Sequence, residues 1–163
     1  MTKIEMLLQG WDVAYGKEDW YPPFSDVLSG VTVEQALWKP TGEHVNTIWE
    51  TLNHLLFYKE RFLNRLTGEE AEYPAGVTND DTFVVPTATD EEWTRTQERF
   101  KAVHLGIREK LVAFTEEQVE EKIPQTKIAI WLQNLAMHDA YHLGQIVFLR
   151  KLQGSWPSRR AFE

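Results

Sequence analysis

Two histidines four residues apart, His138 and His142, are the side chains in this sequence best placed to do chemistry. Residues at positions i and i+4 share one face of an α-helix, so both imidazoles could reach one metal ion. The pattern lacks the glutamate of the HExxH metalloprotease motif, and Asp139, a shorter acid, stands in its place. The spacing alone leaves two alternatives open, which are a shared metal ion or two core histidines bonded to side chains or buried water.

The histidines lie in the most apolar stretch of the chain, residues 126–152. Between Lys127 and Arg150 the only formally charged residue is Asp139, and apolar side chains occupy almost every side of the expected helix. This pattern predicts a helix in the protein interior. One stripe of the helix is polar, with spacings of four, four and three residues: Asn134, His138, His142 and Gln145. Together with Trp131, the two amides of this stripe could complete a polar pocket beside a metal ion.

A third histidine, His54, belongs to another expected long helix, residues 46–66. It points about 140° away from the apolar stripe of that helix, toward polar side chains that include Tyr58. Either His54 is an ordinary exposed histidine, or its face of the helix is one wall of a cleft. In the second case it is the natural third ligand, and three histidines with an open fourth position are typical of catalytic metal sites. We interpret His104 as a structural core residue and His44, in a loop, as incidental.

The elements that must position these residues are all expected to be helical. Ser/Thr followed three residues later by Glu/Gln is the capping-box pattern of helix starts. Five instances are in register with apolar periodicity: Thr2/Glu5, Thr32/Gln35, Thr47/Glu50, Thr89/Glu92 and Thr115/Gln118. Apolar periodicity predicts four long helices, over residues 2–15, 46–66, 90–114 and 126–152, with short helices at 32–38 and 115–121. Residues 69–88 have no helical period, and a loop of this length is usually functional or mobile. We therefore expect an all-α four-helix bundle forming a single domain over residues 1–163.

Composition limits the function classes. The chain has 25 acidic and 17 basic residues and a formal net charge of −8, which argues against nucleic acid as a partner. It contains no cysteine, so any metal must be held by nitrogen and oxygen ligands. The N-terminal residues do not form a secretory signal, and a cytoplasmic location is expected. The polar groups within residues 128–149 argue against a membrane span.

Three segments together resemble the DinB/YfiT-like metalloenzyme superfamily. They are His138-Asp-Ala-Tyr-His142-Leu-Gly-Gln145-Ile146, Asn46-Thr-Ile-Trp-Glu-Thr-Leu-Asn-His54-Leu, and the preceding Ser-Gly-Val-Thr-Val-Glu-Gln-Ala-Leu-Trp-Lys-Pro. The resemblance covers nearly the whole chain and implies an up-down-down-up bundle with a long crossover, often a homodimer. It also implies a divalent metal ion on His54, His138 and His142. Three imidazoles suit several metals, of which zinc or nickel is expected here.

The resemblance further implies a class of chemistry, because relatives in this superfamily include S-transferases and isomerases that use bacillithiol or mycothiol. The leading hypothesis is thus a metal-dependent transferase that joins a low-molecular-weight thiol cosubstrate to a small electrophile. Metal-dependent hydrolysis is a second hypothesis, ranked lower because no charged general base is evident beside His138. A third is a non-enzymatic, stress-associated bundle that binds a small molecule or a partner. Asn134, Gln145, Trp131 and Tyr58 are candidates for supporting the ligands or lining the substrate pocket.

Overall fold

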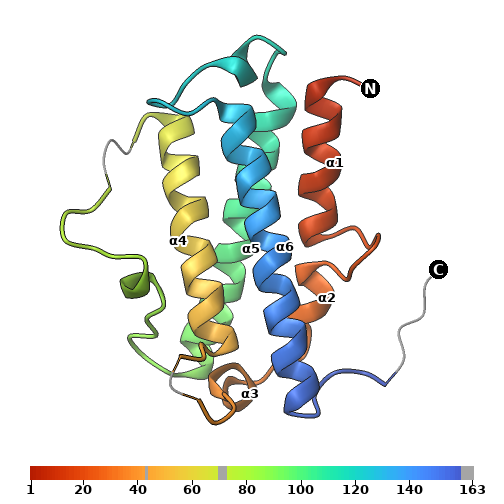
Figure 1. Cartoon of the computed structure of the whole chain (residues 1–163), viewed down its shortest axis with the longest axis vertical. Coiled ribbons are helices and arrows are strands. Elements are labelled where there is room, and N and C mark those ends of the chain that lie inside the picture. Colours follow the sequence, from red (N-terminus) through yellow and green to blue (C-terminus); the bar gives the residue numbers. More distant parts are fainter. Residues whose placement is uncertain (43, 70–72, 159–163) are drawn as a thin grey trace.

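The computed structural model describes residues 1–42, 44–69 and 73–158, and this part of the chain contains helices and no β-strand. Four long helices lie side by side (Figure 1): α1 (Lys3–Tyr15), α4 (Ile48–Thr67), α5 (Asp90–Ala113) and α6 (Ile128–Leu152). The shorter elements are α2 (Phe24–Leu28), α3 (Val33–Leu37) and the single 3₁₀ turns η1 (Asp80–Thr82) and η2 (Gln118–Glu120). The all-α prediction is therefore confirmed.

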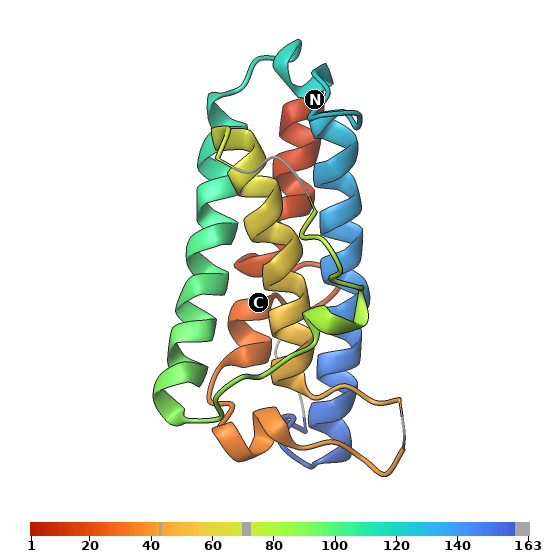
Figure 2. The ribbon, with the colours of Figure 1, turned by 90° about the vertical axis from the view of Figure 1, so that its left-hand side faces the viewer.

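The helices follow an up-down-down-up order. Along the bundle axis α1 and α6 run one way, whereas α4 and α5 both run the other way (Figure 1). Because α4 and α5 are parallel, the connection between them must return along the length of the bundle, and its described parts pass beside α4 and α6 (Figure 2). Gly68 begins this connection with a left-handed backbone, φ +75°, that favours glycine at the end of a helix.

Threonine caps fix most of the helix starts. Thr2, Thr32 and Thr47 each form a complete capping box with the Glu or Gln three residues later. Thr89 accepts from the backbone N–H of Glu92 at 3.3 Å, and no reciprocal bond forms. Thr115 and Gln118 do bond reciprocally. The short helix predicted over 115–121 is nevertheless only the turn η2, because the backbone becomes extended at Glu121.

The core lies between the four long helices and α2. Three buried tryptophans help to fill it, and each indole N–H has an acceptor. Trp11 donates to the carbonyl of His104 at 3.0 Å, Trp49 to Oγ1 of Thr96 at 3.2 Å, and Trp93 to the carbonyl of Val31 at 2.7 Å. These bonds satisfy the polar atom of each large apolar side chain. Other fully buried members of the core include Phe24, Ile48, Leu52, Phe62, Phe100, Ile107, Leu111 and Ile146.

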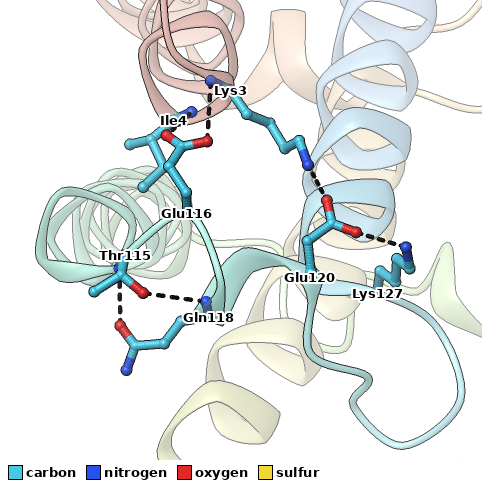
Figure 3. A network of polar contacts seen from close by, with 7 residues as sticks. All are labelled: Lys3, Ile4, Thr115, Glu116, Gln118, Glu120 and Lys127. Carbon is cyan, nitrogen blue, oxygen red and sulfur yellow. Dashed lines mark hydrogen bonds and ion pairs between the residues drawn. The ribbon is translucent and has the colours of Figure 1, made fainter.

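Polar contacts join the start of α1 to the connection between α5 and α6 (Figure 3). The carboxylate of Glu116 accepts from the backbone N–H groups of Lys3 and Ile4 at 3.3 and 3.2 Å. The Glu120 carboxylate binds the ammonium groups of both Lys3 and Lys127. An anion at a helix N-terminus complements the helix dipole. The network therefore sets the start of α1 close to the residues that lead into α6.

The prediction that α6 lies in the protein interior is met on the side that packs into the bundle and not on the opposite side. The helix packs against α1, α2 and α4, but one face remains outside. Met137, Tyr141 and Phe148 are 63%, 65% and 60% exposed, and Ile130 and Leu152 are also exposed. A helix in a four-helix bundle has an outward face whatever its composition. No helix in the described part of the chain combines the length and the apolar character that a membrane span requires.

Candidate metal centre

Three histidines from two helices converge midway along the bundle. His54 comes from α4, and His138 and His142 come from successive turns of α6. The Nε2 atom of His138 lies 2.9 Å from Nε2 of His54 and 3.0 Å from Nε2 of His142. His54 and His142 are 2% and 6% exposed, whereas His138 is half-buried. The odd orientation of His54 is thus resolved, because it points into the bundle and not into bulk water.

Hydrogen bonds to the outer nitrogens fix the tautomers of two of these rings. The hydroxyl of Thr82 lies 2.6 Å from the carbonyl oxygen of Asn79, to which it donates its only proton. It must therefore accept from Nδ1–H of His54, 2.6 Å away. Similarly, Oε1 of Gln145 accepts from Nδ1–H of His142 at 2.8 Å. A neutral imidazole has only one N–H, so Nε2 of both His54 and His142 carries a bare lone pair.

The protons of the three rings cannot satisfy this arrangement. A neutral His138 brings at most one N–H to two bare nitrogens that face it at 2.9 and 3.0 Å. A cation at the centre would instead be attracted by every nitrogen. Zn–N bonds of about 2.0–2.1 Å in tetrahedral geometry separate the ligand nitrogens by about 3.3 Å. The two contacts of His138 are slightly shorter than this, and all three donor atoms lie within 4.8 Å of one another. The donor set therefore fits a divalent metal ion.

The pKa values of the three imidazoles favour their neutral, metal-binding form. Burial, followed by the neighbouring His138 and His142, lowers the pKa of His54 to about 3. Burial, His142 and then Lys59 lower that of His138 to about 4. Burial also lowers the pKa of His142, opposed by its bond to Gln145. Neutral imidazoles are the form that binds metal ions, so little competition from protons is expected at neutral pH.

The long connection contributes two residues that the sequence did not single out. Thr82 is the hydrogen-bond partner of His54, and the ring of Phe83 stacks on that imidazole with a centroid distance of 3.9 Å and an interplanar angle of 12°. The length of the aperiodic segment 69–88 was the available signal that it has a function. Nothing in its residue pattern indicates which of its side chains reaches α4.

The carboxylate of Asp139 does not take the place of the missing metalloprotease glutamate. It points away from the centre and forms a buried ion pair with Lys59 of α4, with 2.6 Å between Oδ2 and Nζ. Lys59 also lies 3.1 Å from Nδ1 of His104, whose ring stacks on Trp11 with centroids 4.4 Å apart. His104 is therefore a core residue outside the cluster. His44 is exposed and likewise lies outside it.

The other predicted site residues divide between two places. Tyr58, Trp131 and Asn134 line a cavity of about 330 Å³ together with His138, Asn79 and Leu135. Gln145 instead supports His142 and borders a separate cavity of about 240 Å³ on its other side. Among the described residues, the three histidines form the one group of His, Cys, Asp or Glu side chains placed to share a metal ion.

The family follows from a comparison with family models. The model of the DinB superfamily matches residues 23–146, a range that contains His54, His138 and His142. The chain belongs to the DinB superfamily. No match was found among curated proteins or among solved structures. Membership in the DinB superfamily and the cluster of three histidines both fit a metal-binding site.

Proposed function

We propose that the chain, as one bundle domain, is a metal-dependent enzyme that transfers a low-molecular-weight thiol to a small electrophile. His54, His138 and His142 would hold zinc or nickel through their Nε2 atoms. The observation that carries the proposal is the pair of bare Nε2 lone pairs that face His138 within 3.0 Å. Asn134, Trp131 and Tyr58 would line the pocket for the electrophile, and Gln145 would hold His142.

A site with three protein ligands is the arrangement of catalytic metal centres, which keep one position for water or substrate. When bound there, a divalent ion supplies a Lewis-acid centre that lowers the pKa of a coordinated thiol or water. The chain contains no cysteine, so the sulfur must come from a cosubstrate. In the transfer, a sulfur–carbon bond forms, the bond to the leaving group breaks with its electron pair, and the thiol proton passes to solvent.

Hydrolysis is the alternative enzymatic function, and the surroundings of the cluster favour it less. A hydrolase of this type uses a carboxylate or another base beside the metal-bound water. Around the three histidines, the described polar contacts come from Thr82 and Gln145, neither of which is a base. The nearby carboxylate of Asp139 is already committed to Lys59. A non-enzymatic binding bundle would retain the histidines but gain nothing from their bare nitrogens.

Metal analysis of purified protein tests the proposal first. We expect about one divalent ion per chain in the wild type and loss of that ion in His54→Ala, His138→Ala and His142→Ala. His44→Ala is the matched control, since this exposed histidine lies outside the cluster. Equal metal content in all five proteins would refute the shared site.

Turnover assays then separate the three functions. The zinc- and nickel-loaded proteins would be given a panel of small electrophiles with and without added bacillithiol or mycothiol. Product formation that requires the thiol supports transfer, whereas turnover independent of thiol supports hydrolysis. An inactive, metal-free protein whose thermal stability is unchanged by chelator would support the binding bundle.

We also propose that the protein is a cytoplasmic homodimer, and the outward face of α6 supports the dimer. Its exposed apolar residues Met137, Tyr141 and Phe148 lie at spacings of four and seven, which forms a stripe suited to a second copy of the helix. The protein's mass in solution should be that of a dimer. Met137→Glu with Phe148→Glu should give the monomer mass, and a monomeric wild type would refute this part.

A further inference from the structure

The cavity beside His138 has no formally charged side chain in its lining. Four residues come from α6, namely Trp131, Asn134, Leu135 and His138, while Tyr58 comes from α4 and Asn79 from the long connection. The volume of about 330 Å³ is near the small end of the range for ligand sites. Since His138 belongs to both the cavity and the histidine cluster, a molecule held here would lie next to the proposed metal position.

The polar groups of this cavity are neutral donors and acceptors. The Tyr58 hydroxyl donates to Oδ1 of Asn79 at 3.0 Å and accepts from Tyr73, so its second lone pair and the Asn79 NH₂ group can serve a ligand. Asn134 adds a second amide. Burial, followed by the neighbouring Tyr73, raises the pKa of Tyr58 to about 12, which keeps the phenol uncharged. These groups match a ligand with an amide, carbonyl or hydroxyl group.

The aromatic walls match a flat apolar body. The indole of Trp131 also contacts Phe62, with ring centroids 5.4 Å apart, and the guanidinium of Arg65, 5.4 Å from its centroid. Arg65 is outside the lining of the cavity. A charged group placed in this cavity would lose water without meeting an opposite charge on the wall, which is unfavourable.

We propose that this cavity selects an uncharged, planar aromatic substrate. Its ring lies between Trp131 and Tyr58, and its hydrogen-bonding substituent lies on Asn134 and Asn79. The inference rests on the proposed function, because it makes this molecule the electrophile that meets the thiol at the metal. It specifies the class of electrophile, which the proposed reaction type alone does not define.

Three ligands of nearly the same shape test the charge preference. Benzamide is neutral, benzoate is an anion and benzamidinium is a cation. Their binding to the full-length, metal-free protein would be measured by ligand-observed NMR, so that coordination of benzoate to a metal does not contribute. We expect benzamide to bind about tenfold more tightly than either ion. Tighter binding of benzoate or benzamidinium, or equal binding of all three, would overturn the proposal.

Substitutions at Asn134 show whether the ligands occupy this cavity. The side chain is exposed at the cavity wall, so its replacement should leave the fold intact, as a thermal melt would show. Asn134→Asp should turn the preference toward benzamidinium, and Asn134→Lys should turn it toward benzoate. Trp131→Ala should abolish benzamide binding, whereas Trp20→Ala, at a residue 94% exposed, should not. An unchanged ranking in both Asn134 variants would place the ligand elsewhere and refute the inference.

The results distinguish an error in the substrate class from an error in the proposed function. If benzoate or benzamidinium binds best while the protein still contains metal and turns over with thiol, the substrate class is wrong and the function stands. If benzamide selectivity holds while the wild type lacks metal, the metal-dependent function is wrong and the cavity remains a site for neutral aromatic ligands.

Discussion

Replacing Lys59 by methionine removes a fully buried charge from the bundle and is expected to destabilise the fold. The ammonium group has no exposed surface and lies 2.6 Å from Asp139, 3.1 Å from Nδ1 of His104, and 4.5 and 4.6 Å from the ring centroids of Trp11 and Phe100. Methionine fills a similar volume without the charge. The change therefore leaves Asp139 buried and unpaired, and it also removes the contact with Nδ1 of His104.

The size of that cost follows from the protonation of Asp139. Burial already raises the pKa of this carboxyl above its ordinary value of 3.8, while the charge of Lys59 opposes the rise. Without Lys59 the group would become neutral. Protonating a carboxyl of pKa 3.8 at pH 7 costs about 4.4 kcal/mol, at about 1.36 kcal/mol per pH unit. Loss of one partner of a buried pair typically costs about 3–5 kcal/mol, in agreement.

The destabilisation caused by Lys59→Met should depend on pH in a definite direction. A carboxyl with a raised pKa in the folded state contributes stability below its unfolded pKa and loses it as the pH rises. We expect the destabilisation of Lys59→Met to shrink by up to about 1.4 kcal/mol for each unit from pH 7 toward pH 4, because the unpaired carboxyl of the variant takes up its proton at less cost as the pH falls. Urea unfolding of metal-free protein across this range, followed by circular dichroism, measures it.

Two further variants complete the experiment. Lys59→Met with Asp139→Leu removes both charges and leaves Nδ1 of His104 as the remaining loss, worth about 1–3 kcal/mol, so the double variant should be more stable than the single one. Arg99→Met removes the exposed ion pair with Glu60 and should cost less than about 1 kcal/mol. A double variant less stable than Lys59→Met, or a cost that does not change with pH, would refute the reasoning.

Three predictions concern the metal centre and its surroundings. Thr82→Val removes the hydrogen-bond acceptor of His54, and Gln145→Leu removes that of His142. Each substitution should weaken zinc binding by about 10–100-fold in a competition titration. Unchanged affinity would mean that the tautomers of the two histidines do not depend on these acceptors. Zinc at about 100 times its dissociation constant should stabilise the wild type by about 2.7 kcal/mol, and an equal gain in His54→Ala would contradict the site. Burial and then Lys59 lower the pKa of His104 to about 2, so stability is lost as the pH falls below 6.5. His104→Phe should lessen that loss by up to about 1.4 kcal/mol per pH unit, and a slope equal to that of wild type would show that His104 titrates normally.

Sequence patterns predicted the helices because their determinants are local. Thr2, Thr32 and Thr47 indicate helix starts because each is followed three residues later by the Glu or Gln that completes its capping box. The shared face of His138 and His142 follows from helical spacing. The pairing of Lys59 with Asp139 was not predicted, since an ion pair between two helices far apart in the sequence has no characteristic residue spacing. The exposed face of α6 was missed for a related reason, because a helix apolar on every side does not indicate which side will lack a neighbour.

The parallel order of α4 and α5 explains why a loop reaches the histidine cluster at all. A helix of 20 residues is about 30 Å long, and a chain that leaves its end must return over that length before a parallel neighbour can begin. Residues 68–89 could extend for about 70 Å, which leaves slack for the turn η1. The described part of this path runs beside α4, where Thr82 orients the imidazole of His54 and Phe83 covers it. A bundle of alternating antiparallel helices with short loops would supply the three histidines without these two contacts. The crossover is therefore as much a part of the site as the ligands, and the tautomer that leaves Nε2 of His54 bare depends on it.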